Sequence, residues 1–137
     1  MTDWLTIGEA AEQTGLSAKQ IRHYEARGLV RDAHRSDAGY RLYDCHQVQQ
    51  LTLIRQARYL GFSLREIDAL LQLWADPTRA SKDVKALAER HRQAIRQRIT
   101  ELQQLEKTLS ALEADCRGDD DPDCAILASL TDPEHRT

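Results

Sequence analysis

The chain has 137 residues, a formal net charge of -3 and three cysteines, and its length suits one compact domain, or one small domain plus an extended element. No apolar run approaches the roughly 18 residues of a membrane helix, and the first residues lack the layout of a signal peptide, so we expect a cytoplasmic protein without a membrane partner. The sequence contains no Gly-rich phosphate loop, no hydrolytic metal site, and no paired acid and base outside its tail, so an enzyme finds no support.

The charge is distributed unevenly along the chain. Residues 15–58 contain eight basic and four acidic side chains, a net charge of +4, whereas residues 113–137 contain eight acidic and two basic ones, a net charge of -6. The first segment therefore suits a polyanion, and the last suits a cation.

Four helices are predicted in the first half, each from a capping box in which a hydroxyl or carboxylate is followed three residues later by Glu or Gln. The pairs are Thr6 with Glu9, Ser17 with Gln20, Asp44 with Gln47, and Ser63 with Glu66. Gly15, Gly28 and Gly61 lie where helix ends favour a left-handed residue. Between residues 28 and 44, alternating apolar positions flank Ser-Asp-Ala-Gly, which predicts a small hairpin, or wing.

A long helix is predicted after Pro77, which ends the fourth helix at Asp76. Ser81 can cap a helix over residues 82–113, which contain no Gly or Pro and would span about 48 Å. Its narrow apolar stripe, spaced three or four residues apart, needs a partner, so we expect a homodimer through this helix. Residues 115–123 are predicted to form a loop, and residues 125–130 one or two helical turns.

The first two helices have the dimensions of a helix-turn-helix, whose second helix can enter a major groove. Arg22 is the best candidate for a base-edge or phosphate contact because its planar fork makes two hydrogen bonds, and Lys19 can contact phosphate as a point charge. Solvated charges on an amphipathic helix explain this helix equally well when it is considered alone. The wing adds Arg35, Tyr40 and Arg41, which suit backbone phosphates beside the groove, and Arg58 follows near the end of the third helix.

Cys116 and Cys124 flank seven residues that include four aspartates. In a reducing compartment such a pair favours a metal or redox-sensing site over a structural disulfide. Two thiolates fit a soft, low-coordinate ion such as Cu(I), whereas Zn(II) usually takes four ligands. Cys45 is interpreted as a half-buried packing residue, and a role for Cys45 or His135 stays open.

The order of these motifs, IRHYEARGLV, then RSDAGYRLY, then the long helix, resembles the MerR family of dimeric transcription regulators. The resemblance covers essentially the whole chain and rests on IR-x-YE-x-x-GL followed by R-x-x-x-GYR-x-Y. It implies a mainly α fold with a winged helix-turn-helix domain and connector helices in residues 1–75. A hinge and a dimerisation helix in an antiparallel coiled coil would occupy residues 76–113, and a metal-binding loop and tail residues 114–137.

The resemblance also implies roles for individual residues. Carried over position by position, the expected DNA contacts are Lys19, Arg22, Tyr24, Arg35, Tyr40, Arg41 and Arg58. The ring of Tyr24 suits the core equally well, with only its hydroxyl reaching phosphate. In the family's zinc and mercury sensors a cysteine at the start of the dimerisation helix completes the metal site from the other protomer, and here that position is Ser81.

Serine is a poor ligand for soft metals, so the site is most similar to that of the copper-efflux regulators. These bind Cu(I), Ag(I) or Au(I) between two thiolates, here Cys116 and Cys124, with one ion per protomer. Ser81 at a helix N-terminus and Lys85 one turn later would offset the negative charge of such a site, which favours monovalent over divalent ions.

The resemblance implies that the homodimer binds a palindromic promoter and, once it holds metal, distorts the DNA so that RNA polymerase can transcribe it. Genes for copper efflux are the expected targets. One alternative is a redox-responsive regulator on the same DNA-binding frame, switched by a Cys116–Cys124 disulfide. Another is a coiled-coil interaction protein that binds no DNA.

Overall fold

The computed structural model describes residues 4–134. It divides into two compact units, the first ending at Leu87 and the second beginning at Ala88, and we describe each by itself. As expected, the fold is mainly α with one small sheet. The helix α5 (Ser81–Asp115) begins in the first unit and continues in the second. No described helix is both long enough and apolar enough to cross a membrane.

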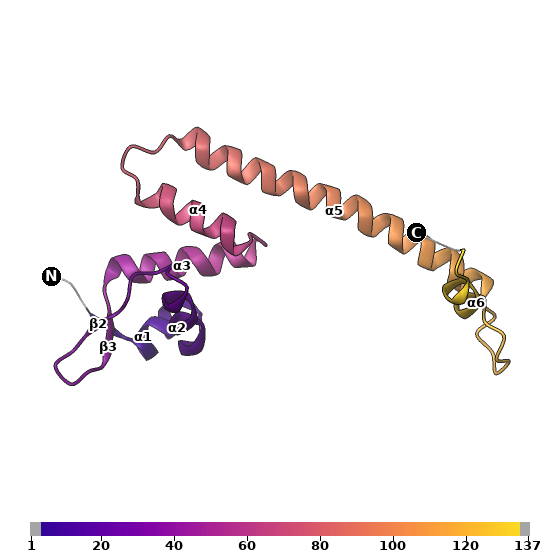
Figure 1. The fold of residues 1–137 in the computed structure, drawn as a ribbon, viewed down its shortest axis with the longest axis horizontal. Helices are drawn as coiled ribbons and strands as arrows, with labels where there is room; N and C mark the ends of the chain where they lie inside the picture. Colours follow the sequence, from indigo (N-terminus) through magenta and orange to yellow (C-terminus); the bar gives the residue numbers. More distant parts are fainter. Residues whose placement is uncertain (1–3, 135–137) are drawn as a thin grey trace. The chain divides into compact units, whose positions relative to one another are not determined.

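The first unit is a winged helix-turn-helix domain (Figure 1). Its helices are α1 (Ile7–Thr14), α2 (Ala18–Ala26), α3 (Cys45–Tyr59) and α4 (Leu64–Ala75), and its strands are β1 (Leu5–Thr6), β2 (His34–Arg35) and β3 (Arg41–Tyr43). The antiparallel sheet has the order β1-β3-β2, with Leu5 opposite Tyr43 and Arg35 opposite Arg41. The β2–β3 hairpin confirms the predicted wing, whereas β1 was not predicted.

All four predicted capping boxes are present, each with reciprocal hydrogen bonds between the cap residue and the third helical residue. Because these bonds satisfy backbone N–H groups that have no partner inside the helix, they fix where each helix begins. Gly15 ends α1 with a φ of 78°, a left-handed conformation that other residues rarely adopt. The turn between α1 and α2 is therefore short and sharp, as a helix-turn-helix requires.

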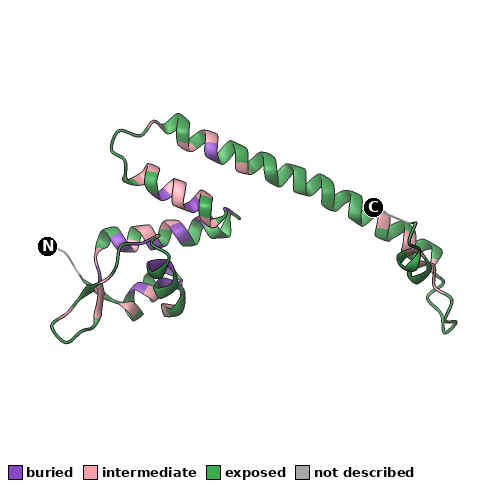
Figure 2. Cartoon of the chain, in the orientation of Figure 1, coloured by how far each residue is buried: buried purple, intermediate pink, exposed green. Residues whose placement is uncertain are grey.

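The core of the first unit is formed by residues of α1, α2, α3 and α4, together with Tyr43 of β3 and Leu87 of α5. Figure 2 shows its buried residues in purple. Ile21, Tyr43, Leu51, Ile54 and Ile67 are completely buried there. Since Ile21 comes from α2 and Tyr43 from the wing, the core fixes both of the elements that carry the expected DNA contacts.

The second unit contains the rest of α5 and α6 (Ala125–Thr131), joined by the loop of residues 116–124. The helix α5 begins at Ser81 itself, one residue earlier than predicted, and ends at Asp115, two residues later. From Ala88 onward nearly all of α5 is exposed (Figure 2). Its exposed apolar residues are Ile95, Ile99, Leu102, Leu105 and Leu109, and we call this set the α5 stripe.

Candidate nucleic-acid interface and thiol site

The second helix of the helix-turn-helix presents basic side chains to solvent. Lys19 and Arg22 are both exposed on α2, while Ile21 faces the core. Tyr24, an expected DNA contact, is only 6% exposed, so its ring is part of the core. Lys19 and Arg22 therefore remain available to a polyanion, whereas Tyr24 packs in the core.

The wing is a tight hairpin closed by short hydrogen bonds. The backbone N–H of Gly39 donates to the carbonyl of Ser36 at 2.8 Å, and Arg35 Nη1 donates to the Gly39 carbonyl at 3.0 Å. Arg35 thus braces the turn with one nitrogen while its other N–H groups remain available. Tyr40 is 71% exposed, so its ring stands at the surface of the wing.

Arg41 is more buried than the sequence suggested. Its Nη1 donates to Oε2 of Glu25 at 2.8 Å, and its side chain is only 29% exposed. Glu25 lies on α2, is buried, and also accepts hydrogen bonds from the Tyr43 hydroxyl and from the backbone N–H of Ala33. Burial and the Glu25 carboxylate together raise the pKa of Tyr43 to about 12. The Glu25 carboxylate therefore joins α2 to the wing.

Two arginines of α3 complete the basic surface of the first unit. Arg58 is exposed in the last turn of α3. Arg55, which was not among the expected contacts, lies against the helix-turn-helix turn, since a Cβ atom on Gly15 would be 2.4 Å from its Nε. The sequence does show that Arg55 is a basic residue one helical turn before Arg58, but only the fold shows that its side chain reaches Gly15.

The two thiols of the second unit are neighbours. The Sγ atoms of Cys116 and Cys124 are 3.6 Å apart, and both residues are half-buried. Cys124 is the N-cap residue of α6. The backbone amides of Leu127 and Ile126 and the Cys116 thiol lower the pKa of Cys124, the Leu127 amide most strongly. A lower pKa increases the fraction of thiolate, which is the form that binds metal or attacks sulfur.

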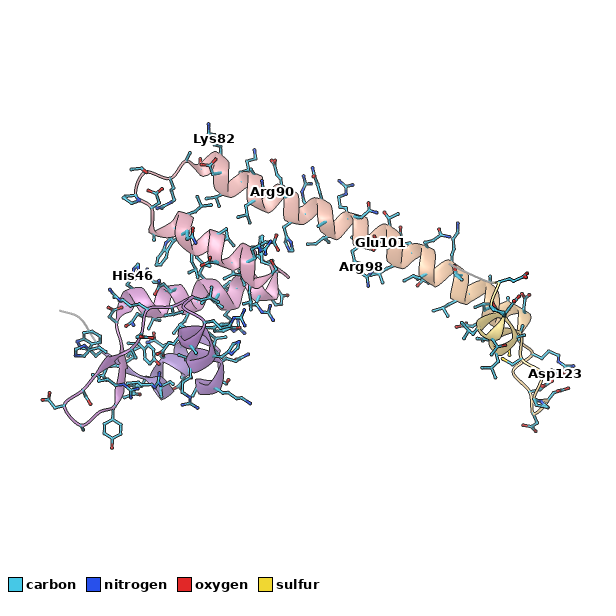
Figure 3. The ribbon with its side chains drawn as sticks, viewed as in Figure 1. His46, Lys82, Arg90, Arg98, Glu101 and Asp123 are labelled. Atoms are coloured by element: carbon cyan, nitrogen blue, oxygen red, sulfur yellow. The ribbon has the colours of Figure 1, made fainter. Side chains whose placement is uncertain are left out.

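Aspartates of the loop form ion pairs and hydrogen bonds within the loop itself. Arg117 pairs with Asp121 at 2.7 Å and with Asp119 at 3.6 Å, and the backbone N–H of Asp123 donates to Asp121 at 3.0 Å. Figure 3 labels Asp123 on this loop. Within residues 4–134 no group of three or more His, Cys, Asp or Glu side chains is arranged to hold a metal ion. The paired thiols are therefore the candidate metal ligands that one protomer offers.

The remaining candidates are placed in the first unit. Ser81 and Lys85 are exposed and line an open cavity of about 540 Å³ together with Pro77, Arg79 and Val84. A role of Ser81 and Lys85 in metal selectivity stays a prediction. Cys45 is exposed rather than half-buried, so that interpretation was wrong: as the first residue of α3, Cys45 faces outward. His135 lies outside the described residues.

A winged helix-turn-helix followed by a long helix defines a class, the helix-turn-helix transcription regulators. The family model "MerR HTH family regulatory protein" matches residues 5–74, and the model "MerR, DNA binding" matches residues 48–112. The chain belongs to the MerR family. This assignment confirms the resemblance inferred from the motifs of α2 and the wing.

Relatives of this family match along nearly the whole chain. The chain is 44% identical to heavy metal-dependent transcription regulator 2 of Rhizobium meliloti, over 92% of this chain and 86% of that one. It is 44% identical to the transcriptional regulator CueR of Escherichia coli, over 93% and 94%. Its fold is similar to the lead(II) complex of the regulator PbrR691 of Ralstonia metallidurans, with a TM-score of 0.80, 34% identity, and coverage of 92% and 98%. These relatives are transcription regulators, not enzymes.

Proposed function

We propose that this protein is a metal-responsive transcriptional regulator that binds a palindromic promoter as a homodimer and is activated by Cu(I), with Ag(I) or Au(I) as equivalent inducers. The observation that carries this proposal is the Cys116–Cys124 pair, two half-buried thiols 3.6 Å apart in a chain whose other unit has an exposed basic helix-turn-helix. Sensing and DNA binding would thus belong to different units of one chain.

DNA binding is supported by the surface of the first unit. Lys19 and Arg22 project from α2, the helix that such a domain places in the major groove. Arg35 and Tyr40 on the wing and Arg58 on α3 are exposed as well and suit phosphate contacts. A MerR-type regulator is known in complex with promoter DNA, and its fold matches 82% of this chain with a TM-score of 0.56 and 26% identity.

The thiol pair fits a soft metal ion of low coordination number. The Sγ atoms of Cys116 and Cys124 are 3.6 Å apart, so both thiolates would be able to hold one such ion. The loop between the cysteines contains Gly118 with a φ of 66° and lies mostly at the surface. When bound, the metal supplies a bond to each thiolate that closes this loop.

Ser81 and Lys85 support selection of a monovalent ion. Two thiolates and one monovalent ion leave a net charge of -1, which the α5 N-terminus and the Lys85 ammonium of the other protomer would offset in the proposed dimer. A third thiolate at residue 81 would favour divalent ions, but this chain has serine there. The metal-bound dimer would then deform the promoter DNA, at a cost of a few kcal/mol or more, so that RNA polymerase can transcribe it. A coupling of about 1–3 kcal/mol between the two sites is sufficient for such a switch.

A second candidate is a redox switch, which the contact between the two thiols also supports. A disulfide requires the sulfurs to approach from 3.6 Å to about 2.05 Å. Two thiols would lose two protons and two electrons to an oxidant such as a peroxide, and the lowered pKa of Cys124 makes it the attacking thiolate. This candidate predicts a response to oxidant without metal.

The test is an anaerobic titration of the reduced dimer with buffered Cu(I) and, separately, Zn(II), with metal occupancy and promoter transcription followed together. We expect one Cu(I) per protomer and a transcriptional response that Zn(II) does not produce. Cys116→Ser and Cys124→Ser should abolish this response and retain DNA affinity, whereas Cys45→Ser is the matched control and should respond normally. An equal response to Zn(II) would reject the role of Ser81, and a response to peroxide alone would establish the redox switch.

A further inference from the structure

A buried carboxylate connects the recognition helix to the wing. Glu25 is 6% exposed, and a carboxylate removed from water is costly unless hydrogen bonds replace the lost solvation. Its Oε2 accepts from Arg41 Nη1 at 2.8 Å and from the backbone N–H of Ala33 at 3.3 Å, while Oε1 accepts from the Tyr43 hydroxyl. One donor comes from the residue before β2 and the other two come from β3.

The contacts of Glu25 constrain two geometric quantities at once. They fix the distance between α2 and the base of the hairpin, because both carboxylate oxygens are engaged by the wing. They also hold the Arg41 guanidinium through Nη1, while the other N–H groups of its planar fork make no hydrogen bond to Glu25. The side chain of Arg41 is 29% exposed, so part of it still reaches the surface.

We propose that Glu25 is a positioning residue for DNA binding, which orients Arg41 toward a backbone phosphate and sets the spacing between α2 and the wing. The inference deepens the proposed function and rests on it. For a DNA duplex of given shape, the phosphates on the two sides of a groove have a limited range of separations, so contacts from α2 and from the wing can form together only within a limited range of spacings. A wing that is free to tilt would lose that simultaneous fit.

If Glu25 has this positioning role, replacing it should change the DNA affinity in the direction opposite to that expected from charge alone. Glu25 contributes negative charge near a surface that would meet DNA. If only charge mattered, Glu25→Gln would bind DNA equally well or more tightly, because a repulsive charge is removed. If Glu25 positions Arg41 and the wing, the same variant binds DNA more weakly.

The experiment measures the affinity of full-length variants for a DNA duplex that the wild-type protein selects from a randomised pool. We expect Glu25→Gln to weaken binding at least about tenfold, the loss typical of a hydrogen bond to a charged group. Asp37→Asn is the matched control, since Asp37 is an exposed carboxylate in the wing turn, and it should bind as tightly as wild type or more tightly. Wild-type or tighter binding by Glu25→Gln would overturn the proposal.

A double-mutant cycle separates positioning from loss of stability. In an Arg41→Ala background, Glu25→Gln should weaken DNA binding far less than it does alone. If the fold-losses of the two single variants instead multiply in the double variant, Glu25 does not act through Arg41. Arg41→Lys, which keeps the charge and replaces the fork, serves if Glu25→Gln does not fold, and it should weaken binding without reducing the salt dependence. Wild-type binding by Arg41→Lys would overturn the proposal, whereas failure of the wild-type protein to select any duplex from the pool would instead reject the DNA-binding function itself.

Discussion

The α5 stripe predicts how strongly the dimer depends on individual side chains. Its five residues are each between 42% and 56% exposed in one protomer. Complete burial of a Leu or Ile side chain contributes roughly 2 kcal/mol, so burial of the exposed half contributes about 1 kcal/mol each. Ten such side chains in a dimer give about 10 kcal/mol, which is comparable to the 4–15 kcal/mol that association costs.

Because the burial energy of the α5 stripe and the cost of association nearly balance, truncating one leucine should weaken the dimer measurably. Leu102→Ala, which occurs twice in the dimer, should remove about 2 kcal/mol of association energy and raise the dimer dissociation constant roughly 30-fold. Sedimentation equilibrium over a range of protein concentrations measures this constant directly. Gln104→Ala is the matched control, because Gln104 is exposed on the side of α5 away from the stripe, and it should leave the constant unchanged.

Two results would refute this reasoning. If Leu102→Ala dimerises as tightly as wild type, the α5 stripe is not the interface. If Gln104→Ala weakens the dimer as much as Leu102→Ala, the loss reflects a general property of the helix rather than burial of the stripe. The Arg98–Glu101 pair, 3.2 Å apart on the same helix and labelled in Figure 3, contributes little in either case because it is exposed.

Two further predictions concern the stability of the first unit. Gly15→Ala should lower the free energy of unfolding by about 1–2 kcal/mol because of its left-handed conformation, and by a further amount because the new Cβ atom would displace Arg55. Gly28 has a φ of 76° and nothing within 4 Å of an added Cβ atom. Gly28→Ala should therefore show only the conformational cost in urea unfolding. Folding raises the pKa of Tyr43 from 10 to about 12, so its stabilising contribution is complete below pH 10 and is lost as the pH rises through 12. Relative to Tyr43→Phe, wild type should therefore lose about 2–3 kcal/mol of unfolding free energy between pH 10 and 12, and equal losses in both proteins would contradict this.

Local sequence signals predicted most of the elements. Each capping box is complete within four residues, so its evidence lies in one short stretch of sequence, and the structure has all four. The strand β1 was missed because its two residues have no period to detect, and they form a strand only by pairing with Leu42 and Tyr43 far along the chain.

The Glu25 network was missed for the same physical reason. Glu25 and Arg41 are 16 residues apart, and a spacing of that kind carries no local pattern. A signal was nevertheless present: Glu25 lies four residues after Ile21 and next to Tyr24, on the apolar side of α2. An acid on the buried side of a helix implies a buried partner, and the wing was the nearest segment rich in basic residues.

The distribution of burial suggests a link between the proposed dimer and the proposed thiol site. Within residues 88–134 no side chain is buried, so the long part of α5 and the short α6 have no core of their own in one protomer. Helices gain most of their stability from packing of an apolar face, and the exposed α5 stripe would supply that face in the proposed dimer. The loop that joins Cys116 to Cys124 begins where α5 ends. Formation of the dimer should therefore also order the thiol site, and a variant with a weakened dimer, such as Leu102→Ala, should bind Cu(I) less tightly at low protein concentration and recover its affinity when concentrated.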